Sequence, residues 1–229
     1  MNSGKLFTQI AFTIGPVGIT QSIVTTWIIM LSLLIFSWLS TRKLSLQPSG
    51  LQIVLEGVFS TMHDAVEEVL PTQVDLVYPF IATLWIFILI SNLIGIIPGL
   101  HSPTADLSVT AALATIVFIS VHWFGVRAEG LKNYLKHYIR PTPFMLPFHL
   151  ISELSRTLAL AIRLFGNIMS LELTALIVVM IAGILVPIPI LMLHIIEAII
   201  QSYIFGILAL IYIAGGIQLQ ELRKQGELS

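Results

Sequence analysis

Long apolar runs separated by short polar segments dominate the chain. Five of them approach or exceed the length of about 20 residues that a helix needs to cross a bilayer. Their apolar residues are consecutive and do not alternate over ten-residue segments, which favours helices over the strands of a membrane barrel. The last two runs are longer than one straight span, so they predict two long, tilted helices that form a hairpin. The five runs are residues 22–40, 77–97, 107–124, 148–184 and 187–219.

A sixth segment, residues 49–72, has a different pattern. Its apolar residues recur at helical spacing, and acidic residues occupy positions between them. This pattern is typical of an amphipathic helix at a membrane surface. The sequence shows no internal repeat, so we predict a single membrane domain over residues 1–229. Its fold class is expected to be an all-α integral membrane protein with about five membrane-embedded helices and this additional interfacial helix.

The composition supports lipid as the main solvent. Of the 229 residues, 56% are hydrophobic and 10% are charged, whereas an average soluble domain has about 25% charged residues. Backbone polar groups in lipid must be satisfied internally, as they are in helices. The chain has no cysteine, which excludes disulfides and thiol-bound metals, and its net charge of −1 suggests no nucleic-acid partner. We find no phosphate-binding glycine loop and no nucleophile–base motif. We therefore expect no cofactor, no metal and no catalytic site of its own.

Basic residues predict the orientation in the membrane. If the N-terminus lies outside, eight basic residues fall inside and only Lys5 falls outside, as the positive-inside rule favours. Residues 1–20 contain one lysine and a weak apolar stretch, so we expect them to be retained and not to act as a signal peptide. The short N-terminus favours the bacterial plasma (inner) membrane, with a cytoplasmic C-terminus. The eight inner residues are Arg42, Lys43, Arg127, Lys132, Lys136, Arg140, Arg223 and Lys224.

Ionisable side chains interrupt the last two apolar runs. Each costs at least about 2.5–3.5 kcal/mol within a membrane span, so such groups usually face a bundle interior or a water-filled path. At about 100° per residue, most polar residues of the fourth run share a face with Arg163, and Glu172 lies opposite. In the fifth run, His194, Glu197 and Gln201 share one face. The residues that share the Arg163 face are Glu153, Arg156, Asn167, Ser170 and Thr174.

Several of these residues also fit purely structural interpretations. Arg156 follows Glu153 by three positions, which is compatible with an internal ion pair. Asn167 can serve a hydrogen bond between helices, and His194 can be a satisfied interior histidine. Arg163 differs, because its own helix offers no acid within one turn. Its partner must come from another helix, another subunit or water.

Four stretches of the chain, in matching order, closely resemble subunit a of F-type ATP synthases. The most specific is SELSRTLALAIRLFGNIMSLEL, Ser152 to Leu173, with its RLFGN core. The others are SNLIGIIPG at 91–99, PTADLSVT at 103–110, and HIIEAIIQSYIFGILALIYIA in the last helix. The resemblance extends from about Gly57 to Leu219. The sequence around RLFGN also resembles a branch of alternative bacterial ATPases, some of which look sodium-coupled. The resemblance therefore leaves open whether the transported ion is H⁺ or Na⁺.

The resemblance implies an ion-translocating stator subunit of the Fo sector. In that family, two aqueous half-channels lead to carboxylates on a rotating c-ring, a peripheral stalk with subunit b holds the stator, and the catalytic sites are in other chains. The implied partners are therefore the c-ring, subunit b and membrane lipid. The implied roles are Arg163 as separator of the half-channels, Asn167 and Gln201 beside it, Glu172, His194 and Glu197 in the outer path, and Glu153 and Arg156 in the inner path. Asp106 is expected to cap the following helix.

Two other functions remain to be weighed. A standalone ion channel or secondary transporter is one, although such carriers often contain repeated halves and none is visible here. A non-conducting structural subunit is the other; its polar stripes would only join helices. The structural alternative predicts that Arg163→Lys is tolerated, and copurification with a c-ring would separate the first interpretation from both.

Overall fold

The computed structural model describes residues 10–14, 17–42, 50–97, 100–130, 146–183 and 188–226. In these residues the regular secondary structure is helical apart from one small N-terminal hairpin, so the predicted all-α membrane fold class is confirmed. Five of the described helices are long and apolar enough to cross a membrane. They are α1 (Gln21–Thr41), α3 (Val74–Leu93), α4 (Leu107–Glu129), α6 (Leu146–Ala182) and α7 (Ile188–Gly226), and α2 (Gly50–Val69) is the additional helix.

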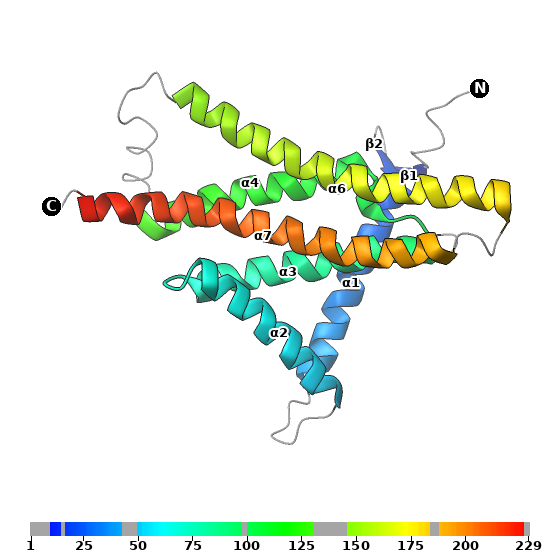
Figure 1. The fold of residues 1–229 in the computed structure, drawn as a ribbon, viewed down its shortest axis with the longest axis horizontal. Coiled ribbons are helices and arrows are strands. Elements are labelled where there is room, and N and C mark those ends of the chain that lie inside the picture. Colours follow the sequence, from blue (N-terminus) through cyan, green and yellow to red (C-terminus); the bar gives the residue numbers. More distant parts are fainter. Residues whose placement is uncertain are drawn as a thin grey trace.

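Helix α7 lies at the centre of the bundle, where it packs against α3, α4 and α6 (Figure 1). Apolar side chains from all four helices form one core, in which Ile81, Leu164 and Phe205 are at most 1% exposed. Helix α1 leaves the bundle at a steep angle in Figure 1 and contacts mainly α3. The arrangement gives α7 neighbours on several sides, while α6 is covered on one side only.

The two ends of the bundle carry different elements. At one end, strands β1 (Ile10–Ile14) and β2 (Val17–Thr20) form an antiparallel hairpin that leads into α1. The same end contains the short 3₁₀ helices η2 (Ile94–Ile96) and η3 (Pro103–Ala105), and η3 contacts both α1 and α6. We call the end of the bundle that contains β1, β2, η2 and η3 the hairpin end. The opposite end contains the turn between α2 and α3 and the C-terminal parts of α4 and α7 (Figure 1).

Some helix boundaries differ from those expected from the apolar runs. Helix α3 begins three residues earlier, because Val74 already belongs to a buried stripe with Val77 and Ile81. Helix α4 continues past the expected end at residue 124 and stops at Gly130, which has φ +82° and donates its backbone N–H to Val126 O at 2.7 Å. Gly183, with φ +80°, ends α6 in the same left-handed region.

Helix α2 has the amphipathic pattern that was expected, but its apolar side chains divide into two groups. Near its C-terminus, Val66 is fully buried and Met62 packs against the core that α3 contributes to. Near its N-terminus, Val54 and Val58 are 66% and 44% exposed. The exposed group is available to lipid, and the location of α2 at the membrane surface stays a prediction.

The orientation in the membrane also stays a prediction. Of the basic residues that support it, Arg42 and Arg127 are described, and Arg127 lies at the opposite end in the last turn of α4. The others fall outside the described residues, entirely for Lys5, Lys43, Lys132, Lys136 and Arg140 and in their side chains for Arg223 and Lys224.

Candidate functional site

Arg163 lies on the outward face of α6. Its side chain is exposed, while the next residue, Leu164, is completely buried against the bundle. Leu160 and Ile168 continue the buried stripe one turn to either side, at 2% and 0% exposed. Arg163 makes no hydrogen bond or ion pair with any residue that the structure describes. A permanent cation is therefore presented to whatever covers this face of α6.

A hydrogen bond joins α6 to α7 one turn after this arginine. Asn167 Nδ2 donates to Gln201 Oε1 at 2.8 Å, and Gln201 is only 1% exposed. Because Asn167 follows Arg163 by four positions, its side chain lies on the same part of the helix surface. Gln201 Nε2 is buried without a hydrogen-bond partner among the described residues. Of the three predicted residues, the structure thus joins Asn167 and Gln201 at the junction of the two helices, while Arg163 lies one turn away on α6 and makes no hydrogen bond to either.

Glu172 lies toward the hairpin end of α6 and contacts the segment before α4. Its side chain is 18% exposed. One carboxylate oxygen accepts the backbone N–H of Ser102 at 2.7 Å, and the other lies 3.5 Å from His101 Nδ1. His101 itself is 70% exposed. Because Glu172 lies on the opposite face of α6 from Arg163, its side chain points toward the protein. Its contact with Ser102 is on the protein side, and its contact with His101 is on the solvent side.

His194 of α7 joins a buried polar network at the same end. Its Nε2 lies 3.2 Å from Asn92 O, and it is 1% exposed. Thr104 donates to Asn92 Oδ1 at 2.6 Å, and the hydroxyls of Ser102 and Thr104 are also 2.6 Å apart. Ser102 Oγ additionally donates to Ser91 O at 2.6 Å. Two hydroxyl protons thus serve three contacts, so the network has alternative proton arrangements.

Gly95 in η2 allows these groups to converge. A Cβ atom at this position would lie 2.7 Å from Glu172 Oε1, 3.2 Å from Ser102 Cβ and 3.3 Å from His194 Cε1. Two of the residues predicted for the outer path, Glu172 and His194, therefore meet around one glycine. Glu197 is half-buried and makes no hydrogen bond or ion pair with another described residue, so the structure does not join it to this cluster.

A second polar cluster lies toward the start of α6. Glu153 Oε2 is 3.6 Å from His122 Nε2 on α4, and the Arg156 guanidinium lies over the Tyr212 ring of α7, 5.7 Å from its centroid. Glu153, Arg156 and Tyr212 also line a small cavity of about 30 Å³ between α4, α6 and α7. A volume of this size accommodates one or two water molecules beside polar partners.

Between the two clusters the interior is apolar except for the hydrogen-bonded pair Asn167 and Gln201. Glu153 and Glu172 are separated by 19 positions on α6, or about 28 Å along a helix. Leu160, Leu164 and Ile168 of α6 and Phe205 and Leu210 of α7 are at most 2% exposed and belong to the hydrophobic core. Apart from the Asn167–Gln201 pair, apolar side chains therefore separate the two clusters of the described chain near the level of Arg163.

Sequence reasoning missed several residues of these clusters. His101 and His122 each pair with a predicted carboxylate, and Asn92, Ser102 and Thr104 form the buried network. A signal was present, since Asn92 and His122 are polar residues within apolar runs. The expected cap is confirmed, because the Asp106 side chain accepts the backbone N–H of Ser108 at 2.9 Å.

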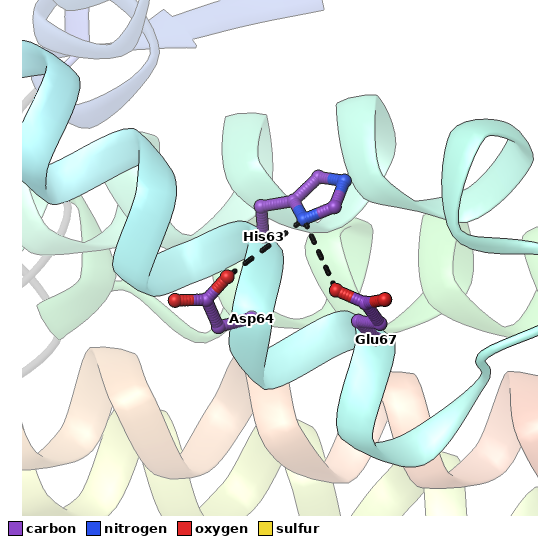
Figure 2. A group of neighbouring side chains, drawn as sticks. All are labelled: His63, Asp64 and Glu67. Carbon is purple, nitrogen blue, oxygen red and sulfur yellow. Dashed lines mark ion pairs between the residues drawn. The ribbon is translucent and has the colours of Figure 1, made fainter.

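A separate cluster of possible metal ligands lies on α2, shown in Figure 2. The ligand atoms of His63, Asp64 and Glu67 lie within 4.8 Å of one another. His63 Nδ1 is 3.8 Å from Glu67 Oε2 and 4.0 Å from Asp64 Oδ1. All three side chains are at least 40% exposed, and weak ion pairs of this kind are common on solvated helix faces. We assign no ligand to this cluster.

The fold and the polar clusters together define a multi-pass membrane protein that keeps ionisable side chains within its helices. Residues 23–214 match the family model described as ATP synthase A chain. The chain belongs to this family, and the resemblance drawn from its sequence motifs is confirmed. It is thus a membrane component of an ATP synthase.

Curated relatives match over nearly the whole chain. The chain is 71% identical to an ATP synthase subunit a of Legionella pneumophila (strain Paris) over 228 residues, which cover 99% of both chains. It is 58% identical to ATP synthase subunit a 2 of Pelobacter propionicus over 217 residues, which cover 95% of both chains. It is 57% identical to ATP synthase subunit a 1 of Hahella chejuensis, over 95% of this chain and 92% of the relative.

Proposed function

We propose that this chain is the ion-translocating stator subunit of the Fo sector, with two aqueous half-channels that meet a rotating c-ring at Arg163. The flow of H⁺ or Na⁺ through these half-channels drives rotation, and the catalytic sites for ATP are in other chains of the complex. Subunit b of a peripheral stalk and membrane lipid are the other proposed neighbours.

The observation that carries this proposal is a charged helix face that lacks a cover. Only 11% of the α6 span and 6% of the α1 span are buried, against 50% of the α7 span. Helix α1 contains no charged residue, so lipid suits its exposed surface. The exposed surface of α6 includes Arg156 and Arg163, and a cation in hydrocarbon costs at least about 2.5–3.5 kcal/mol. A protein partner that carries carboxylates removes this cost.

The two polar clusters support separate access routes to that partner. Glu172 and His194 belong to the route at the hairpin end, and we keep Glu197 as a third candidate for it. Glu153 and Arg156 belong to the route at the opposite end. Because apolar side chains separate the clusters, with the Asn167–Gln201 hydrogen bond as the polar exception, we infer that an ion entering by one route leaves this chain and travels with the partner to reach the other.

Electrostatics gives Arg163 its proposed role. A charged carboxylate cannot face lipid at low cost, whereas a neutralised carboxylate can. A fixed positive charge favours the ionised form of a passing carboxylate and so promotes release of its ion. Arginine suits this task because it stays protonated, whereas a buried lysine can lose its charge. Asn167 and Gln201 then orient the guanidinium. The membrane potential supplies about 2.3 kcal/mol per charge per 100 mV.

The proposal places the chain in the bacterial plasma membrane with its hairpin end outside. The N-terminus is then outside and the C-terminus is cytoplasmic. Since the chain has no native cysteine, single cysteines introduced at either end of the bundle report the orientation with a membrane-impermeant maleimide. Labelling of the hairpin end from the cytoplasmic side would contradict the assignment.

The decisive test is Arg163→Ala in the reconstituted complex. We expect the complex to assemble but to lose ATP-driven ion pumping into vesicles, because the carboxylates of the partner lose their counter-charge. Arg42→Ala is the matched control, since Arg42 lies at the end of α1 over the Trp38 ring and outside both proposed routes. Coupled pumping retained by Arg163→Ala would refute the proposal. Full activity of Arg163→Lys would favour a purely structural role.

A further inference from the structure

We propose that His101 is a proton relay at the mouth of the outer route, passing protons between bulk water and Glu172. This inference rests on the proposed function, because that function places Glu172 in the route. It adds two points. His101 lies outside the sequence motifs that identify the family, and the ion at this mouth is a proton.

The surroundings of Glu172 leave one direction open for exchange. One carboxylate oxygen is held by the backbone N–H of Ser102 at 2.7 Å, while the other faces His101 Nδ1 at 3.5 Å. Glu172 is 18% exposed and His101 is 70% exposed. The imidazole thus lies between a mostly covered carboxylate and open solvent, in the position that a relay requires.

The chemistry of imidazole fits this position. Histidine is the side chain that commonly gains and loses a proton between pH 5 and 8. In the uptake direction, water or buffer protonates Nε2 while the Nδ1–H bond breaks and its proton bonds to the Glu172 carboxylate oxygen. The ring then carries its proton on Nε2, and proton exchange of the exposed imidazole with water returns a proton to Nδ1 for the next transfer. A shift of less than about 1 Å brings the 3.5 Å separation into hydrogen-bond range.

The other titratable groups at this end do not provide an equivalent exit. His194 faces the cluster from α7 but is 1% exposed, with its Nε2 directed at Asn92 O. Glu197 is on the same helix without a described partner, and Asp106 is committed to the cap of α4. Helix α1, which also contacts η3, has no titratable residue. In the described part of this end, His101 is the exposed group in direct contact with the buried carboxylate.

The experiment compares His101→Ala with the parent complex in vesicles at pH 6 and pH 8. The pH is the same on both sides, and ATP synthesis is driven by a potassium diffusion potential. We expect synthesis to fall on the order of tenfold at pH 8 and less than about twofold at pH 6, where about a hundredfold more hydrated protons reach Glu172 directly. Added imidazole should restore the rate at pH 8. His101→Gln, which keeps a polar contact, should behave like His101→Ala.

The matched control is His63→Ala. His63 also pairs with a glutamate, at 3.8 Å, but it lies on α2 with both side chains exposed (Figure 2). We expect His63→Ala to keep parental rates at both pH values. The amount of assembled complex is measured for every variant, so that loss of assembly is separated from loss of rate.

Several outcomes would overturn the relay. A loss that is equal at both pH values and is not relieved by imidazole would indicate a structural ion pair. A synthesis rate that depends on Na⁺ and not on His101 would show that the transported ion is not a proton. Glu172→Gln separates this inference from the proposed function. If Glu172→Gln slows synthesis while His101→Ala matches His63→Ala, only the relay fails. If Glu172→Gln has parental rates, the outer route itself is wrong.

Discussion

The contact between α3 and α7 depends on the absence of a side chain at Gly206. A Cβ atom there would lie 2.6 Å from Trp85 Cε2 and closer still to two other atoms of the indole. Trp85 is 4% exposed, stacks on Tyr203 with ring centroids 6.0 Å apart, and donates its indole N–H to Tyr203 O at 3.2 Å. Gly206→Ala must therefore displace the tryptophan or separate the two helices.

The expected cost follows from these contacts. Overpacking a tight interior typically costs about 1–3 kcal/mol, and the displaced indole N–H loses a hydrogen bond in a buried site. The lost hydrogen bond and the better helix propensity of alanine, each about 1 kcal/mol, roughly cancel, so we expect Gly206→Ala to destabilise the chain by about 1–3 kcal/mol. Gly215→Ala on the same helix is the matched control, because a Cβ atom there meets nothing within 4 Å. Alanine is the better helix former by about 1 kcal/mol, so this control should be neutral or stabilising.

Thermal denaturation of the purified complex, followed by loss of this chain from the assembly, measures the difference between the two variants. Trp85→Phe provides a further check, because a smaller ring relieves the overlap. The double variant Gly206→Ala/Trp85→Phe should cost less than the sum of the single changes, which shows coupling between the two sites. Equal midpoints for Gly206→Ala and Gly215→Ala would refute the packing argument.

Three further predictions concern the polar contacts. Asp106→Ala should destabilise the start of α4 by about 1 kcal/mol through loss of its cap, seen as faster amide exchange there, whereas Asp106→Asn should stay close to the parent. Asn167→Ala and Gln201→Ala should each lower ATP-driven pumping, and their effects should not add, because the two residues share one hydrogen bond. A double-mutant cycle should give a coupling of roughly 0.6–1.7 kcal/mol, and independent effects would argue against the pair. Thr104→Val should destabilise the chain by about 1–3 kcal/mol, because Asn92 Oδ1 loses a buried donor, and parental thermal stability would contradict this.

The sequence predicted the fold class because length and apolarity suffice to indicate membrane helices. The run at 22–40 agrees with α1 within one residue at each end, whereas the run at 187–219 agrees with α7 at its start only, because α7 continues to Gly226. Boundaries were less predictable. The extra turns of α4 depend on where Gly130 adopts a positive φ, and the early start of α3 depends on burial of Val74. Tertiary contacts decided both. The N-terminal hairpin of β1 and β2 had no clear pattern of its own.

The candidate site was predictable only where residues share a helix. Helical phase correctly separated Glu172 from the face of Arg163, and the spacing of His194 and Gln201 indicated inward-facing positions. Phase alone could not reveal that Glu172 meets the loop before α4, because that contact joins residues 70 positions apart. The same limit applied to His101. Its contact is between distant segments, and His101 lies in the loop before η3, where no helical spacing relates it to Glu172.

The bare cation on α6 has a consequence for how the protein is made. A newly inserted copy that has not yet met its neighbours exposes Arg163 to the acyl chains, at the free-energy cost of a charge in oil. Such an orphan should tilt, draw water into the bilayer or be cleared by membrane proteases. Assembly order then matters for biogenesis, and a cell that lacks the acidic partner should retain little of this chain. The charge that we propose to act in rotation would then also mark unassembled copies for removal during synthesis.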